Sequence, residues 1–299
     1  MGIKSQAYRP LAIRSATAVL LATAAVLGNL VASSPQSAAA SVASPCVRKG
    51  AAAGRVATAE ALDQFSATMY EQGYTAAAVE KALESDWCLT RVSSSRGSTP
   101  LSAETDIYWT HSAIFYDDDD RRYHATVAFR WYNHNYWDDE GWPTGCFNSG
   151  IGGRDGLGLR LSGGEYAIYG YSASVWGDPY LNPYNDDYGT VTLSSASSVN
   201  QYGVGFTWQD NTRNVRSGVV CQGGKDYADY DIYGGQVFLT VRALNGSCRL
   251  AQVFGDYVHT WDSTAVTGIG AGPWSFSISW SNYGSNFESA YAGDRVTIC

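Results

Sequence analysis

Six cysteines, all placed downstream of an N-terminal apolar segment, constrain this chain more than any other feature. Three basic residues accompany an apolar stretch from about Ala16 to Ala32, and the small-residue run Ala38 to Ala40 follows it. That order is typical of a signal peptide that directs export and is then removed. An even number of cysteines in an exported protein predicts disulfide bonds. We therefore expect residues 1–40 to be a signal peptide and the protein to be secreted into the extracellular space.

The spacing of the cysteines suggests one of their pairings. The six are Cys46, Cys88, Cys146, Cys221, Cys248 and Cys299. Cys46 and Cys88 bracket the one helical stretch of the chain, so the simplest prediction joins them, which removes roughly 4 kcal/mol of unfolded-state entropy. Other pairings of six cysteines stay open.

The charge balance excludes some kinds of partner. Without Lys4, Arg9 and Arg14 of the signal, 17 Lys and Arg face 28 Asp and Glu, a formal charge of −11. Nucleic acids and anionic membranes bind cationic surfaces, and no basic cluster longer than Arg121-Arg122 follows the signal. No second apolar stretch approaches the roughly 20 residues that cross a bilayer. We expect no nucleic-acid partner and no transmembrane anchor, while the oligomeric state stays unknown.

Apolar residues at three-to-four spacing predict helices between Thr58 and Ser85. The pattern breaks at Gly73-Tyr74, and the hydroxyl of Thr75 can cap a second helix by accepting a bond from a first-turn N–H. A Ser-rich polar stretch comes next. We therefore expect a helical hairpin segment at residues 41–92 and a linker at residues 93–104.

Beyond the linker the period of the apolar residues becomes two, as in strands with one buried face. The clearest strand runs from Pro273 to Asn282, where large apolar residues alternate with serines. A hairpin is predicted around the acidic turn Asp117 to Asp120, with Trp109 and Phe115 on one face of its first strand and His124 on the opposite face.

Further hairpins fit around Gly163-Gly164, Ser195 to Ser198 and Asn245-Gly246. Many short strands at regular spacing favour a two-layer all-β domain. The predicted fold is mainly β, an antiparallel β-sandwich or closed barrel at residues 105–299, preceded by the short α-helical hairpin.

Common catalytic and cofactor signatures are missing from the chain. There is no GxSxG, HExxH or phosphate-binding loop. The histidines lack ligand spacing, and opposite faces for His111 and His124 disfavour a shared metal. The acidic turn from Asp117 to Asp120 is interpreted as solvated. We expect no cofactor, with irregular calcium loops at Asp186-Asp187 or Asp226 to Asp231 as the open alternative.

Two loops combine aromatic rings with planar polar side chains. A pyranose stacks its apolar face on Trp or Tyr and needs amide or carboxylate partners for its hydroxyls. These loops therefore predict a non-catalytic protein that binds a neutral glycan of a cell wall or extracellular polymer. The predicted ligand-binding residues are Trp137, Trp142, Tyr180, Tyr184, Asn182, Asn185 and Asp186.

Two alternatives remain open. A secreted glycan hydrolase would use a pair of carboxyl groups, for which Glu140, Asp155 and Glu165 are the candidates because each lies beside aromatic residues or glycines. A structural or inhibitory exoprotein would instead bind another protein through a flat β surface. Catalysis is less favoured than binding, and we predict no catalytic residue.

Overall fold

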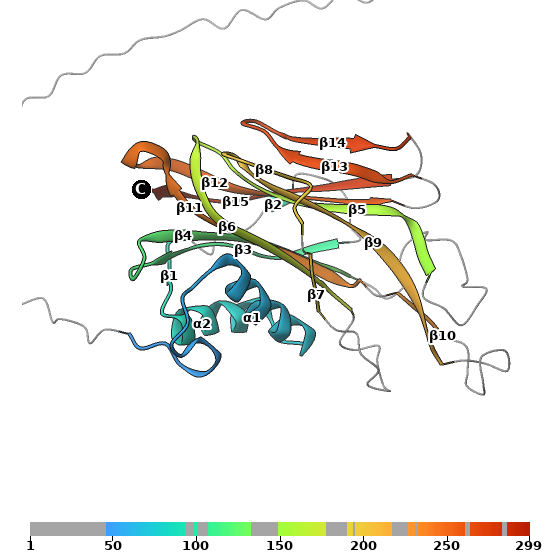
Figure 1. Ribbon diagram of the computed structural model, residues 1–299, viewed down its shortest axis with the longest axis horizontal. Helices are drawn as coiled ribbons and strands as arrows, with labels where there is room; N and C mark the ends of the chain where they lie inside the picture. The colour runs from blue at the N-terminus through green and yellow to red at the C-terminus, as the bar shows by residue number, and fades with distance from the viewer. Residues whose placement is uncertain are drawn as a thin grey trace, which may run out of the picture. The chain divides into compact units, whose positions relative to one another are not determined.

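The computed structural model of the chain describes residues 46–93, 99–100, 107–132, 149–177, 190–193, 195–216, 227–230, 232–260, 264–282 and 286–299. Two antiparallel sheets enclose the main core in this part of the chain (Figure 1). Two helices pack on the outer face of one sheet, and a two-stranded hairpin packs on the other.

The sheet that carries the helices is called the helix-side sheet. Its strand order places β11 in the centre, between β4 and β6. The six strands, in their spatial order, are β1 (Thr90–Arg91), β3 (Ile107–Asp117), β4 (Arg122–Trp131), β11 (Gly234–Ala243), β6 (Tyr166–Trp176) and β7 (Val191–Thr192).

The opposite sheet is called the hairpin-side sheet, and β5 and β12 lie at its centre. Its path runs through β10 (Tyr227–Tyr230), β9 (Gly203–Arg216), β5 (Ser149–Leu161), β12 (Arg249–Thr260), β15 (Asn286–Ile298) and β2 (Thr99–Pro100). The short β8 (Ser198–Asn200) pairs with β9, and the covering hairpin consists of β13 (Val266–Ala271) and β14 (Phe276–Trp280).

The sequence predicted either a β-sandwich or a closed barrel. Within the described residues both sheets are open, so the arrangement is sandwich-like and not a closed barrel. The turns at Gly163-Gly164 and Asn245-Gly246 do not close hairpins, since the strands on either side belong to different sheets. The segment Ser195 to Ser198 also links the two sheets. These three predicted hairpins were wrong. A tight turn followed by an alternating strand looks the same in sequence whether its two strands pair with each other or lie in different sheets.

Helices α1 (Ala59–Glu71) and α2 (Ala76–Trp87) form where the three-to-four spacing places them. Thr58 caps α1 by accepting from the N–H of Ala61, and Thr75 caps α2 by accepting from the N–H of Ala78. Short 3₁₀ turns occur at Gly50–Ala52 and Leu244–Gly246. Apolar residues of both helices pack with Phe115 and Phe238 of the helix-side sheet, which makes a second core.

The central core is built from the inward faces of both sheets. Phe129 of β4 stacks on Tyr257 of β12 with ring centroids 4.1 Å apart, and Tyr257 also stacks on Trp208 of β9 at 6.0 Å. Leu157 and Leu159 of β5 are fully buried beside them. Each buried aromatic side chain of this kind contributes roughly 1.5–3 kcal/mol.

The β13–β14 hairpin packs on a stripe of glycines in β5 and β9. A Cβ on Gly158 would overlap the ring of Phe276, and a Cβ on Gly205 would overlap the carbonyl oxygen of Ile269. The glycines therefore allow the hairpin to approach the sheet closely. Phe276, Ile278 and Trp280 of the predicted Ser-alternating strand are half-buried there, while Trp274 is 89% exposed.

The register of the β3–β4 hairpin corrects two expectations. A bulge between Trp109 and His111 shifts the first strand, so Trp109 faces the central core and Phe115 faces the helices. Phe115 pairs directly with His124 on that helix-side face. The acidic turn is also less solvated than predicted, because Asp117 is buried against Arg48.

Two disulfides join described cysteines. Cys46–Cys88 forms as the spacing predicted, and Cys248–Cys299 ties the start of β12 to the end of the chain. Cys146 and Cys221 lie outside the described residues. Among the helices that the structure describes, none is long and apolar enough to span a bilayer.

Candidate functional site

One end of the two sheets gathers the polar and aromatic residues from which a site can be built. At this end β4 stops at Trp131 and β6 stops at Trp176, on either side of Gly234, the first residue of β11. Trp131 also lies edge-on to His259 of β12 at 5.2 Å, so the end of β12 in the hairpin-side sheet lies beside it. We call this region the loop end.

The predicted sugar-binding residues follow these strand ends in the chain. Residues 133–148 come after β4 and residues 178–189 come after β6. All seven predicted residues lie outside the described part of the chain, as does Glu140, so the structure does not test them. They are Trp137, Trp142, Tyr180, Tyr184, Asn182, Asn185 and Asp186.

Asp155 of β5 is the centre of a buried polar network at the loop end. Its Oδ2 accepts from the hydroxyl of Tyr257 at 2.8 Å and lies 2.9 Å from Nδ1 of His259. Its Oδ1 accepts from the backbone N–H of Thr260 at 2.9 Å. Because both oxygens are engaged and the residue is 1% exposed, Asp155 anchors the end of β12 and is poorly placed to meet a substrate.

Asp210 of β9 extends this network toward β10 at the edge of the hairpin-side sheet. It accepts from the indole N–H of Trp208 at 2.8 Å, and its carboxylate lies within 4.8 Å of the ligand atoms of Asp155 and His259. The three residues could hold a metal by distance alone, but Asp155 already spends both oxygens on protein donors. The arrangement therefore fits a rigid link between β5 and β12 better than a metal site.

Two further groups of carboxylates, Glu165 and the pair Asp256 and Glu288, lack the geometry of a glycosidase pair. Glu165 lies in an exposed turn and accepts from Gln201 at 2.9 Å. Burial first, and then the nearby charge of Glu288 and a hydrogen bond to it, raise the pKa of Asp256 to about 9. A hydrogen-bonded pair is closer than the roughly 5–9.5 Å that either hydrolytic mechanism needs between its two carboxyl groups.

Two tyrosines missed in the sequence form an exposed aromatic surface at the loop end. Tyr108 of β3 is 42% exposed and Tyr132, just after β4, is 58% exposed. Their ring centroids are 5.6 Å apart, and the guanidinium of Arg130 lies 5.6 Å from the ring of Tyr108. The sequence signal was available, since Tyr108 stands between the inward-facing Ile107 and Trp109 and must point outward.

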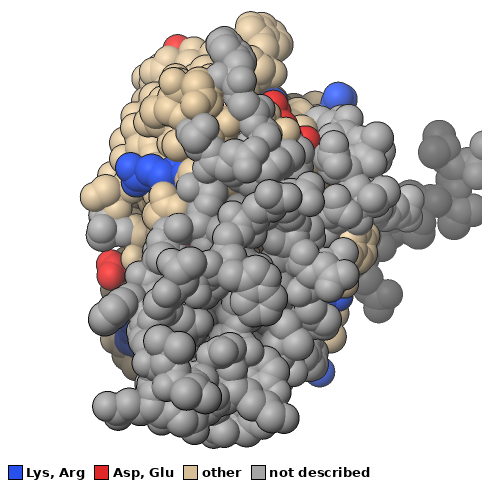
Figure 2. Space-filling model, turned by 90° about the vertical axis from the view of Figure 1, so that its right-hand side faces the viewer, with Lys and Arg blue, Asp and Glu red and all other residues tan. Residues whose placement is uncertain are grey.

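Charge on the described surface of this side is sparse. Figure 2 faces the right-hand side of Figure 1, and in it the basic and acidic side chains of the described residues stand apart, with no continuous surface of one sign.

Comparison with known proteins adds little to this picture. No protein-family model matches the chain, and no curated protein matches it. Among solved structures the chain is similar to Clostridium perfringens delta-toxin, with 8% identity and a TM-score of 0.25, over 71% of this chain and 97% of that one. A TM-score this low does not establish a shared fold, so the function has to follow from the chain's own residues.

Proposed function

We propose that the chain is an exported, non-catalytic protein that binds a neutral glycan at the loop end. In this proposal residues 1–40 are removed as a signal peptide, residues 41–92 and the linker at 93–104 precede the β domain at 105–299, and disulfides hold the extracellular product together. The four described cysteines, all paired, support an oxidising destination.

The observation that carries the proposal is the exposed pair Tyr108 and Tyr132. Two aromatic rings held side by side on strand ends form a preorganised stacking surface for the apolar face of a sugar. Tyr132 is the last described residue before the segment that carries Trp137 and Trp142, and Tyr108 lies beside it. Binding residues are often found on the segments that follow the ends of a rigid scaffold.

The buried network around Asp155 supports the same proposal because it fixes the strand ends at the loop end. Asp155 joins β5 to β12, while Trp131 of β4 packs on His259 of β12. The two sheets are thereby held together at the loop end. Residues that bind a ligand next to these strand ends should therefore lose less conformational entropy on binding.

The test measures depletion of the oxidised protein from solution by insoluble cellulose, chitin, xylan and peptidoglycan, with albumin as the reference protein. We expect one polymer to remove the protein specifically. Tyr132→Ala and Tyr108→Ala should each weaken that binding roughly tenfold, or about 1.4 kcal/mol.

Tyr169→Ala is the matched control, because Tyr169 is 49% exposed but lies beside Arg122 at the opposite end of the strands. Its binding should match that of the wild type. If no polymer depletes the protein, or if Tyr169→Ala weakens binding as much as Tyr132→Ala does, glycan binding at the loop end is wrong. New reducing ends in the supernatant would instead indicate a hydrolase.

A further inference from the structure

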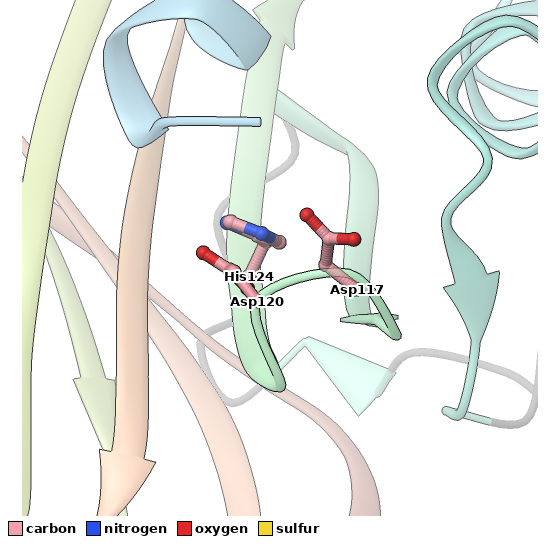
Figure 3. A group of neighbouring side chains, drawn as sticks. All are labelled: Asp117, Asp120 and His124. Carbon is pink, nitrogen blue, oxygen red and sulfur yellow. The ribbon is translucent and has the colours of Figure 1, made fainter. Parts of the chain in front are cut away.

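At the end of the strands opposite the loop end, which we call the turn end, β3 turns into β4 and β5 into β6. One feature of the turn end is a cluster of Asp117, Asp120 and His124, and Figure 3 shows the ring of His124 between the two carboxylates. Arg48 pairs with Asp117 at 2.9 Å, and Arg122 lies 3.2 Å from Asp120. Cations of the chain itself therefore already occupy this cluster.

The other feature of the turn end is the turn of the β13–β14 hairpin (Figure 1). Asn200 donates to the carbonyl of Ala271 at 2.7 Å, and Arg160, near the end of β5, donates to the carbonyl of Pro273 at 3.4 Å. Trp274 follows in the turn and is 89% exposed, the largest exposed fraction of any large apolar side chain in the described residues. The turn is therefore held to the sheet while its indole stands in water.

The hairpin carries no charge of its own. Residues 264–282 contain no Asp, Glu, Lys, Arg or His. The serines of β14 are exposed, and its apolar residues are only half-buried against the sheet. Arg160 approaches the turn from the sheet, but it is 5% exposed and lies 4.0 Å from the ring of Phe254. A partner that covers the tip therefore removes no charged group of the hairpin from water.

The size of the tip indicates which kind of partner fits it. A stable protein interface covers roughly 800 Å² on each side. One Trp side chain buries only about 150–250 Å². A single indole at the end of two strands is thus too small for a protein interface, whereas a lipid surface accepts a single ring. Trp is enriched at the boundary between membrane and water, because its ring is apolar and its N–H stays hydrated.

The charge balance of the chain selects the kind of lipid. The full chain has a formal net charge of −8, so a bilayer with anionic headgroups repels it. Zwitterionic headgroups such as phosphatidylcholine carry no net charge. Their oxygens can accept hydrogen bonds from hydroxyls such as that of Ser275, which is exposed next to Trp274.

We propose that the tip of the β13–β14 hairpin docks on the surface of a bilayer of zwitterionic phospholipid, with Trp274 as its anchor. The ring enters the boundary between headgroups and hydrocarbon, while the hairpin stays folded on β5 and β9. Trp274 lies at the turn end and Tyr132 at the loop end, so this contact does not depend on glycan binding. One molecule can make both contacts at once.

The experiment sediments the oxidised protein with sucrose-loaded vesicles of phosphatidylcholine and measures the protein in the pellet. We expect the bound fraction to rise with lipid concentration and to respond little to added salt, because no ion pair forms. Vesicles that also contain anionic phosphatidylglycerol should bind less protein. Trp274→Ala should lower the partition coefficient roughly tenfold or more, because most of the apolar surface of the anchor is lost.

Two variants serve as controls. Tyr169→Ala removes another aromatic ring at the turn end, 49% exposed but on the helix-side sheet, and should partition like the wild type. Tyr132→Ala should keep vesicle binding, and Trp274→Ala should keep depletion by the polymer, so the lipid and glycan proposals fail separately. Trp274→Ala should also keep the wild-type melting temperature, because so exposed a side chain makes few contacts in the folded protein.

Wild-type protein that stays in the supernatant with phosphatidylcholine vesicles would overturn the proposal. Equal partition of Trp274→Ala and the wild type would overturn it too. Light scattering without lipid tests for a second copy of the chain as the partner. A dimer that Trp274→Ala dissociates would assign the tip to that contact and not to lipid.

Discussion

Gln236 of β11 donates through its Nε2 to both the backbone oxygen and the carboxylate of Asp63 in α1, each at 2.7 Å. The other carboxylate oxygen of Asp63 accepts from Ser172 at 2.6 Å and Ser174 at 2.7 Å. Four hydrogen bonds thus join one fully buried residue of a helix to two strands of the helix-side sheet.

This junction predicts a pH-dependent stability. Burial raises the pKa of Asp63 to about 7, although the hydrogen bonds from Ser172, Ser174 and Gln236 lower it. The unfolded chain loses this proton near the ordinary pKa of 3.8, so the contribution of Asp63 to the free energy of unfolding falls as the pH rises from about 4 to about 7. Urea unfolding at pH 5 and pH 8 measures the fall.

Asp63→Asn keeps the shape and removes the titration, so the difference in stability between the two pH values should shrink in the variant. Asp256 also titrates with a raised pKa and is present in both proteins, which makes the wild-type-minus-variant difference the informative quantity. An identical pH dependence in both proteins would refute the role of Asp63.

The network around Asp155 predicts a specific loss of stability. Tyr257→Phe removes the hydroxyl that donates to Asp155 and leaves the stacked ring in place. The free energy of unfolding should drop by about 1–3 kcal/mol, because a buried carboxylate loses one of its donors. Tyr132→Phe, which loses an exposed hydroxyl, should change stability by less than about 0.5 kcal/mol in the same denaturation experiment.

The disulfide Cys46–Cys88 closes a loop over both helices, with 42 positions between its ends. Replacing both cysteines by alanine should lower the free energy of unfolding by roughly 4 kcal/mol, since the unfolded chain regains the entropy of the open loop. Urea denaturation of the double variant beside the oxidised wild type measures this. A loss well below 1 kcal/mol would mean that other contacts already hold the segment in the unfolded state.

The glycine stripe beneath the β13–β14 hairpin predicts a sharp contrast between two glycines. Gly205→Ala would place a Cβ against the carbonyl oxygen of Ile269, whereas a Cβ on Gly268 would meet nothing within 4 Å. Gly205→Ala should therefore lower the melting temperature and expose Trp280 to quenchers of fluorescence. Gly268→Ala should do neither, and equal behaviour of the two variants would contradict close packing of the hairpin on the sheet.

Local signals in the sequence were sufficient for the caps and for one disulfide. Thr75 precedes a run of helix formers and caps α2, and Cys46 pairs with Cys88 across the helices. These features depend on residues close in sequence or on a simple loop-closure argument. The alternation of apolar residues likewise placed Trp109 and His124 on opposite faces of the hairpin, as they are in the structure.

Features that depend on distant residues were not readable in the same way. The bulge near Trp109 reverses the face of Phe115, and sequence alternation contains no mark of it. Asp117 was interpreted as solvated because its partner Arg48 lies 69 positions away. Asp155 was grouped with possible hydrolase residues, while the Tyr257 and His259 that enclose it are more than 100 positions along the chain.

The β13–β14 hairpin has a small core of its own, in which Val258, Val266 and Ile269 are the buried members. Since the sheet beneath contributes mostly glycines at this contact, little apolar area holds the hairpin in place compared with the strands around Tyr257. Segments with few buried contacts open at a smaller free energy than the molecule as a whole. Hydrogen exchange should therefore be faster for the amides of β14 than for those of β12. Such a difference would mean that the hairpin opens first and the two sheets unfold in a second step.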